Sequence, residues 1–392
     1  MSKKLLIATV ATTLTVLAQS SSVAEMPPTS PGAPPAGNRW AGKKWKIRFF
    51  HDEINSSFTI NDFQFAGPRY GIAVGVRNDK GKVHSVALVT RDGGGKWAFV
   101  PLKAPAISVF ALEDGRTWAV SEKDIYYSEE AGADWRKLKR PEGVGRVYFL
   151  RDGLKGWAFG AGKTFYQTKD GGKEWTEVEE SKGLPTTDEY TSFHWMEFIN
   201  EKVGIVAGNS QRPRKGMQRG PDWMFPELSV YRREVPTTLI TMETRDGGTT
   251  WKHHVSSIFG SIVRIRANMP WGLALFAYSG GGIDWSSEVL ELNFSNGKNR
   301  PVFRRKDLNV TDVSLTPPGR VALAGLTVQG KFRESGVPTK PRVLVSDDRE
   351  NWFELPVDYR AFGTRALLSW VDDDNAWMAT SEGMILKLEK VL

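Results

Sequence analysis

The chain has 392 residues and no cysteine, and its 53 lysines and arginines outnumber 45 aspartates and glutamates, which gives a formal net charge of +8 at pH 7. The absence of cysteine excludes a disulfide framework, a thiolate metal site and a lipid-modified N-terminal cysteine. The excess of positive charge favours acidic partners or membrane surfaces.

The N-terminal region carries the pattern of an export signal. Lys3 and Lys4 precede an uncharged apolar run, Leu5–Ala18, and the small residues Ser22–Ala24 follow it. This order predicts a signal peptide over residues 1–24 and a periplasmic or secreted protein. A membrane anchor is the alternative, but the run is shorter than the roughly 20 apolar residues that span a bilayer, and no later run reaches that length. We therefore expect no transmembrane segment in the mature chain.

The residues after the predicted signal peptide form two parts of different composition. Residues 25–43 are rich in proline, glycine and alanine and predict a flexible linker. Residues 44–392, about 350 in all, are long for one domain but of normal length for a β-propeller. Because export separates the protein from nucleic acid and no nucleic-acid-binding motif appears, we expect a protein partner or an acidic extracellular ligand and no nucleic acid.

A short phrase recurs along the chain and is the main clue to the fold. Near-identical copies occupy Thr90–Trp97, Thr168–Trp175 and Thr244–Trp251, and each contains Asp-Gly-Gly before a tryptophan. Two weaker copies, Ser128–Trp135 and Ser346–Trp352, keep only part of the phrase and are interpreted as decayed members of the series. Repetition of this kind indicates an array of similar structural units.

The chemistry of the phrase is that of a hairpin turn. The aspartate carboxylate can accept backbone N–H groups, glycine supplies positive φ, and the tryptophan begins the next strand with a large apolar surface. The phrase resembles the Asp-box, or BNR repeat, found between the third and fourth strands of propeller blades in sialidases and other proteins. We therefore assign structural rather than catalytic roles to eight residues: Asp92, Trp97, Trp135, Asp170, Trp175, Asp246, Trp251 and Trp352.

A second repeated feature sets the number of blades. Each unit begins with two short apolar strands joined by a turn, and the second strand is apolar enough to be buried on both faces. Seven such pairs predict an all-β fold, a single propeller of about seven four-stranded blades, with six or eight as alternatives. The pairs span Phe58–Gly75, Ile107–Val120, Val147–Gly160, Phe193–Gly208, Ile262–Ala277, Val313–Gly325 and Leu367–Thr380.

The two ends of the domain are expected to share one blade. The last unit runs out of chain after its third strand, Met384–Leu388, whereas Lys44–Phe50 is a strand without a unit of its own. We predict that the N-terminal strand completes the final blade, because this pairing removes two exposed sheet edges.

The longest predicted insertions all fall between the second and third strands of a blade: Arg77–His84, Asn209–Pro236, Ser279–Ser287 and Thr327–Pro341. The insertion at 209–236 combines arginines with aromatic residues, as binding hot spots do. A solvated loop that folds over its own blade is the alternative. The candidate binding residues are Arg212, Arg214, Arg219, Trp223, Tyr231, Arg232 and Arg233, with Lys331 and Arg333 from the 327–341 insertion.

The resemblance extends beyond the turn. The segment Phe149–Trp175 looks like the repeat unit of the photosystem II assembly and stability factor family, whose members are exported Asp-box propellers that bind protein subunits. This resemblance implies a non-enzymatic binding or assembly role. That family carries an arginine patch, whose residues are not matched to positions here.

A glycan hydrolase of sialidase-like or glucanase-like type is the alternative function. A sialidase needs a Phe/Tyr-Arg-Ile-Pro motif near its start, which this chain lacks. The carboxylates that would serve a hydrolase are Asp188, Glu189 and Asp284.

We expect no cofactor and no metal. His253 and His254 are neighbours and point to opposite faces of a strand, so they cannot share an ion without distortion. Asp372–Asp374 is interpreted as a solvated turn, with loose calcium binding as the alternative.

Overall fold

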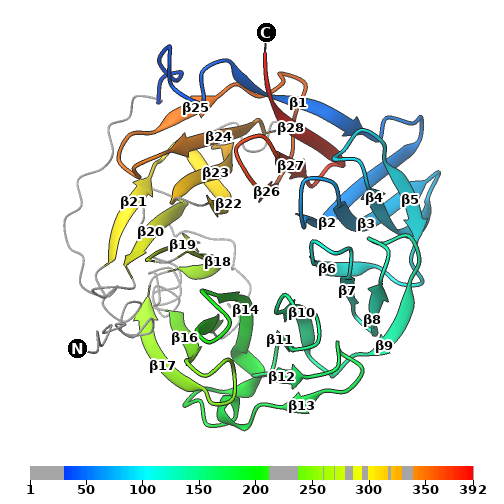
Figure 1. Cartoon of the computed structure of the whole chain (residues 1–392), viewed down its shortest axis with the longest axis vertical. Coiled ribbons are helices and arrows are strands. Elements are labelled where there is room, and N and C mark those ends of the chain that lie inside the picture. The colour runs from blue at the N-terminus through cyan, green and yellow to red at the C-terminus, as the bar shows by residue number, and fades with distance from the viewer. Residues whose placement is uncertain are drawn as a thin grey trace, which may run out of the picture. The chain divides into compact units, whose positions relative to one another are not determined.

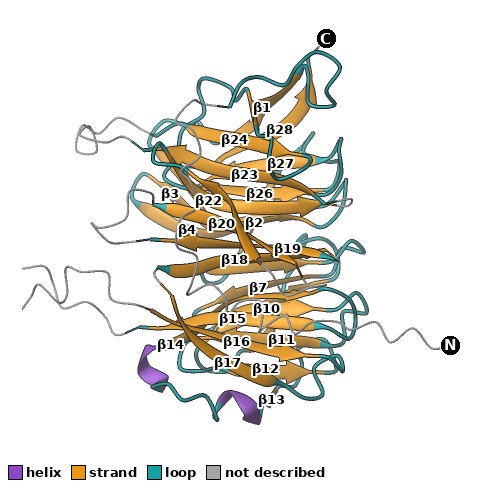
Figure 2. Cartoon of the chain, turned by 90° about the vertical axis from the view of Figure 1, so that its left-hand side faces the viewer, coloured by secondary structure: helices purple, strands orange, loops and turns teal. Residues whose placement is uncertain are grey.

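The computed structural model describes residues 31–211, 237–258, 260–268, 270–278, 286–293, 299–316, 319–328 and 339–391. In this part of the chain, 28 strands form seven four-stranded antiparallel sheets, the blades of a β-propeller. Strands make up most of the structure in Figure 2. The helical segments among the described residues are two short 3-10 helices, η2 (Glu179–Ser181) and η3 (Asp188–Tyr190). No helix in the described residues is long and apolar enough to cross a membrane.

The contacts divide the chain into two compact units. The larger unit holds blades one, two, three, six and seven. Blade one is β2 (Ser56–Phe65), β3 (Gly71–Asp79), β4 (Lys82–Thr90) and β5 (Ala98–Pro101); blade two is β6 (Ala106–Ala111), β7 (Thr117–Ser121), β8 (Asp124–Ser128) and β9 (Arg136–Lys139); blade three is β10 (Val144–Phe149), β11 (Gly156–Gly160), β12 (Phe165–Thr168) and β13 (Thr176–Glu177). Blade six is β22 (Leu308–Thr316), β23 (Arg320–Thr327), β24 (Pro341–Ser346) and β25 (Phe353–Leu355), and blade seven is β1 (Lys43–Phe50), β28 (Met384–Lys390), β27 (Ala376–Thr380) and β26 (Ala366–Trp370).

The smaller unit contains blades four and five together with both 3-10 helices. Blade four is β14 (Thr191–Phe198), β15 (Gly204–Ser210), β16 (Thr237–Thr244) and β17 (Lys252–Ile258), and blade five is β18 (Ser261–Asn268), β19 (Trp271–Ala277), β20 (Ser287–Asn293) and β21 (Asn299–Arg304). Its core is aliphatic and includes Ile205, Leu239 and Ile265.

The seven predicted strand pairs are confirmed as the first and second strands of the seven blades. Second strands are strongly buried, and every residue of β7, β11 and β27 is buried. A strand covered on both faces has no polar side to display, which explains why these stretches are continuous apolar runs rather than alternating ones.

The predicted closure of the last blade is also confirmed. Strand β1 pairs antiparallel with β28, from Lys43↔Lys390 to Phe50↔Met384, and the two strands lie side by side in Figure 1. The edge of β28 is therefore covered, and both ends of the domain belong to one sheet.

The linker predicted over residues 25–43 extends too far toward the domain. Trp40 is only 1% exposed and belongs to the core of blades six and seven. Its ring meets Trp370 edge to face at 5.6 Å, and its backbone N–H donates to the Asn38 carboxamide. The composition of the segment is linker-like, but one buried tryptophan is enough to anchor its end.

The predicted insertion at 77–84 is a longer hairpin rather than a loop. Strands β3 and β4 remain paired to Asp79↔Lys82, and a two-residue turn, Lys80-Gly81, joins them with φ of 51° and 86°. Positive φ at both positions is the type I′ geometry that matches strand twist. The other three insertions do lie between second and third strands.

Neighbouring blades are joined by a repeated aromatic contact. Phe149, the last residue of β10, stacks on Trp118 of the preceding blade, with ring centroids 3.9 Å apart. The Trp118 indole N–H donates to the Gly171 carbonyl, which belongs to the Asp-box turn of blade three. Gly156 provides the space, because a Cβ there would lie 2.3 Å from the Phe149 ring.

Candidate functional site

The Asp-box turns lie between third and fourth strands, where the aspartates act on backbone groups. In blade one the Asp92 carboxylate accepts hydrogen bonds from the Lys96 N–H and the Thr90 hydroxyl, both at 2.9 Å. The Thr90 hydroxyl in turn accepts the Gly94 N–H at 3.0 Å. The Lys96 N–H, followed by the Thr90 hydroxyl, lowers the pKa of Asp92. The carboxylate therefore holds the turn closed and is occupied by it.

The copies in blades three and four repeat this arrangement. Asp170 accepts the N–H groups of Lys173 and Glu174 at 3.0 and 3.1 Å. Asp246 accepts those of Thr249 and Thr250, and the Thr250 hydroxyl, its strongest partner, contributes most to a pKa of about 2.

The two weaker copies differ from each other, although both were interpreted as decayed. Asp348 accepts the N–H groups of Glu350 and Asn351 at 2.8 and 2.7 Å, so its turn keeps the full carboxylate cap. Arg349 takes φ of 66° there, in the region that glycine occupies in the three near-identical copies. In blade two the Ser128 hydroxyl accepts two N–H groups, and the Glu130 carboxylate makes no hydrogen bond among the described residues.

The Asp-box tryptophans cover the blades. Trp251 and Trp352 are 5% and 6% exposed, and Trp97, Trp135 and Trp175 are partly buried against neighbouring core clusters. Their positions are those of packing residues.

The binding residues predicted from sequence fall outside the described residues. Arg212, Arg214, Arg219, Trp223, Tyr231, Arg232 and Arg233 belong to residues 212–236, and Lys331 and Arg333 belong to residues 329–338. The described strands that flank these segments are β15 and β16, and β23 and β24.

The hydrolase candidates are not gathered into a described cleft. Asp188 and Glu189 are consecutive residues of the exposed helix η3, and Asp188 pairs with Lys163 at 2.8 Å. Asp284 lies outside the described residues. Asp372–Asp374 forms a turn in which the Asp372 carboxylate accepts the Asn375 N–H at 2.9 Å, and no group of three potential metal ligands is found among the residues with described positions.

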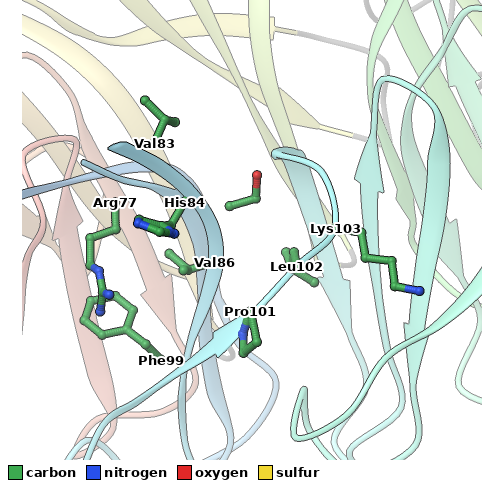
Figure 3. A pocket seen from close by; sticks show the side chains of 9 residues that line it. Arg77, Val83, His84, Val86, Phe99, Pro101, Leu102 and Lys103 are labelled. Carbon is green, nitrogen blue, oxygen red and sulfur yellow. The ribbon is translucent and has the colours of Figure 1, made fainter. Parts of the chain in front are cut away.

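A pocket of about 390 Å³ opens beside the long hairpin of blade one. Its walls combine cationic, aromatic and aliphatic side chains. Figure 3 shows the Arg77 side chain reaching the Phe99 ring with His84 beside it, and Lys103 on the far side beyond Leu102. The lining residues are Arg77, Val83, His84, Ser85, Val86, Phe99, Pro101, Leu102 and Lys103. We refer to this site as the blade-one pocket.

The strand register explains why these side chains converge. Arg77 pairs with His84, Val86 with Pro101, and Leu88 with Phe99. Paired residues project from the same face of a sheet, as do every second residue along a strand. Arg77, His84, Val86, Phe99 and Pro101 therefore share one face, and the Arg77 guanidinium carbon lies 5.0 Å from the centre of the Phe99 ring.

Arg77 is held in place by a chain of polar contacts. Its Nε donates to Asp79 Oδ2 at 2.8 Å, and the Ser56 hydroxyl donates to Asp79 Oδ1. The Ser56 hydroxyl has a single proton, so His51 Nε2, 2.6 Å from the Ser56 oxygen, is the donor in that contact. The pKa of Asp79 is lowered, first by the Ser56 hydroxyl and then by Arg77.

These contacts leave donors facing the pocket. Among the described residues, the Arg77 guanidinium pairs with Asp79 through Nε while its terminal nitrogens donate no hydrogen bond, and the Lys103 ammonium has no hydrogen-bond or ion-pair partner. A fixed guanidinium over an aromatic ring is suited to a carboxylate or carbonyl next to an apolar group. The sequence signal for this site is weak, because Ser56, Arg77 and Phe99 come from three different strands; the sequence indicates only the 77–84 insertion.

Comparison with known proteins supports the fold. No family model matches the chain. The vacuolar protein sorting/targeting protein 10 of Fusarium vanettenii is 31% identical over 120 residues, and the chain covers only 7% of its length. Among solved structures, YCF48 bound to D1 peptide has a TM-score of 0.56 at 15% identity, covering 91% of this chain and 99% of that one. YCF48 from Cyanidioschyzon merolae gives 0.55 at 14% identity, with 88% and 98% covered. The GH74 xyloglucanase of Xanthomonas campestris gives 0.58 at 11% identity, covering 88% of this chain and 53% of that one.

Proposed function

We propose that this chain is an exported, non-enzymatic β-propeller that binds a segment of another protein, in the manner of an assembly or stability factor. The observation that carries the proposal is the blade-one pocket, where Arg77 is fixed between Asp79 and Phe99 and its terminal nitrogens donate no hydrogen bond among the described residues. A preorganised donor over an aromatic floor loses little entropy when it binds, as expected of a recognition site.

Two further observations support binding rather than catalysis. One solved structure with the same fold over nearly its whole length is described as bound to a peptide. The Asp-box carboxylates are engaged by backbone N–H groups of their own turns, which leaves them as structural groups. Export is supported by the charge and apolar pattern of residues 1–24.

A glycan hydrolase remains the second candidate, favoured by the likeness to the GH74 xyloglucanase. A hydrolase requires two carboxyl groups roughly 5 to 9.5 Å apart across a cleft. Asp188 and Glu189 sit in one helical turn, and Asp188 is already paired with Lys163.

A displayed library of random peptides tests the proposal. Selection on the folded chain should enrich acidic sequences that Arg77→Ala captures at least about tenfold less, the effect of losing about 1.4 kcal/mol of binding. Arg136→Ala is the matched control, because Arg136 also stacks on an aromatic ring, Tyr127, and pairs with a carboxylate, Glu129. Failure to enrich any peptide, or release of new reducing ends from a glycan polymer, would overturn the proposed function.

A further inference from the structure

The long hairpin of blade one extends beyond its neighbouring strand. Strands β3 and β4 stay paired as far as Asp79↔Lys82, whereas β4 and β5 pair only to Val86↔Pro101. One further hydrogen bond, from the Leu102 N–H to the Ser85 carbonyl at 2.8 Å, ends the contact between β4 and the chain after β5. Residues 82–84 therefore have β3 on one side and no described strand on the other.

The direction of the backbone groups at this edge follows from the register. In an antiparallel sheet the N–H and C=O of a residue point to the same side, and successive residues alternate. The Ser85 carbonyl points toward β5, so the N–H and C=O of Val83 point the same way, past the end of β5. The Val83 side chain is 65% exposed, and the blade-one pocket lies at this edge.

We propose that this edge binds an acidic, extended segment of the partner protein, which pairs antiparallel with residues 82–85 in line with β5. This inference rests on the proposed function and specifies how the segment binds. The mode is strand addition, in which main-chain hydrogen bonds supply affinity and pockets select alternate side chains.

The register also defines the preferred sequence. A residue opposite His84 lies on the face shared by Arg77 and Phe99, where a carboxylate meets the terminal guanidinium nitrogens of Arg77, which donate no described hydrogen bond. The residue after it lies opposite Val83 on the other face, where an apolar side chain fits. Lys82 lies on this edge, and Lys103 lines the pocket beside it. Both add positive charge, so the segment is acidic and apolar in alternation.

The exposed edge is short, which fits selective binding. Long unpaired edges promote aggregation, and proteins limit them by length and by lysines. Here the open stretch is about three residues long and contains Lys82. Backbone pairing alone is therefore weak, and capture depends on the carboxylate in the blade-one pocket.

A blocked peptide of sequence Thr-Val-Glu-Val-Thr is the probe, measured by fluorescence anisotropy on the full chain. Exchanging its glutamate for glutamine should weaken binding by about tenfold or more, as should N-methylation of the valine after the glutamate, which removes the N–H that pairs with the Val83 carbonyl. Hydrogen exchange of residues 82–85 should slow when the peptide binds.

Two variants test the protein side of the edge. Val83→Pro removes an N–H that no described strand uses and should weaken peptide binding by about tenfold, whereas Val83→Ala keeps this N–H and should change binding by less than about threefold. If Val83→Pro does not fold, the binding of the N-methylated peptide to the unaltered chain still tests strand addition. Equal binding of parent and N-methylated peptides would overturn strand addition. Library peptides captured equally by Val83→Pro would overturn it too, while the proposed function would stand.

Discussion

The ring of Phe65 lies flat on the ring of Trp377, with centroids 3.6 Å apart and planes 3° from parallel. Phe65 ends the first strand of blade one, and Trp377 belongs to β27 of blade seven. The Trp377 indole N–H donates to the Gly93 carbonyl of the blade-one Asp-box at 3.3 Å. A Cβ at Gly71 would lie 2.3 Å from the Phe65 ring, so glycine is required there. The first and last blades are thus joined by the same contact as blades two and three.

Truncation of this stack should destabilise the fold strongly. Phe65→Ala removes a buried aromatic side chain and should lower the free energy of unfolding by about 3 to 5 kcal/mol. Phe50→Ala is the control, since Phe50 is 37% exposed and should cost less than about 1 kcal/mol. Urea denaturation measures both, and equal losses would contradict an anchoring role for the stack.

The segment before β1 should contribute to the stability of the fold mainly through Trp40. Trp40→Ala should cost about 3 to 5 kcal/mol, because Trp40 is buried against Trp45 and Trp370. Arg39→Ala, which removes only exposed ion pairs with Asp347 and Asp373, should change stability by less than about 1 kcal/mol. Thermal unfolding that left Trp40→Ala unchanged would restore the linker interpretation.

The Asp-box carboxylates should contribute stability and not binding. Asp170→Ala leaves the N–H groups of Lys173 and Glu174 without their acceptor and should lower stability by about 1 to 2 kcal/mol. Glu130→Ala at the corresponding turn of blade two should be nearly neutral, because that carboxylate accepts no described hydrogen bond. Peptide binding should be unchanged in both, and a variant that melted normally but lost binding would refute the structural assignment.

Lowering the pH should reduce the stability that the Asp-box turns contribute. Asp246 and Asp348 have pKa values of about 2 in the folded chain, against an ordinary value of 3.8. Their ionised carboxylates therefore contribute fully to the free energy of unfolding above pH 3.8, and this contribution is lost as the pH falls through about 2. The free energy of unfolding, measured in urea at a series of pH values, should therefore fall between about pH 4 and pH 2. Asp246→Asn should flatten this dependence, and an unchanged slope would contradict the assignment.

The basic insertion remains a prediction from sequence. Replacing Arg212–Arg233 by a short Gly-Ser turn should leave the propeller folded and should reduce association with an acidic partner, mainly at low salt. Exposed charges are screened over about 10 Å at 0.1 M ionic strength, so the difference from the unaltered chain should shrink as salt rises. Stopped-flow association at two salt concentrations measures this effect. Unchanged rates would leave the blade-one pocket as the binding surface.

The amino-acid sequence by itself determined the repeated blades, their number to within one, and the closure by the N-terminal strand. These features depend on chemistry within a few neighbouring residues: the Asp-Gly-Gly turn, the flat apolar second strand and the unmatched strand Lys44–Phe50. Each blade repeats them, so several weak local signals add up to one fold.

Only the tertiary structure decided the rest, because the contacts join residues far apart in the chain. Trp40 looks like part of a linker until Trp370 covers it, and Phe65 looks like any strand residue until Trp377 lies against it. The blade-one pocket likewise depends on register, since a shift of one residue would move Arg77 to the face opposite Phe99. Strand pairing sets that register, and neither the composition nor the spacing of the segment contains it.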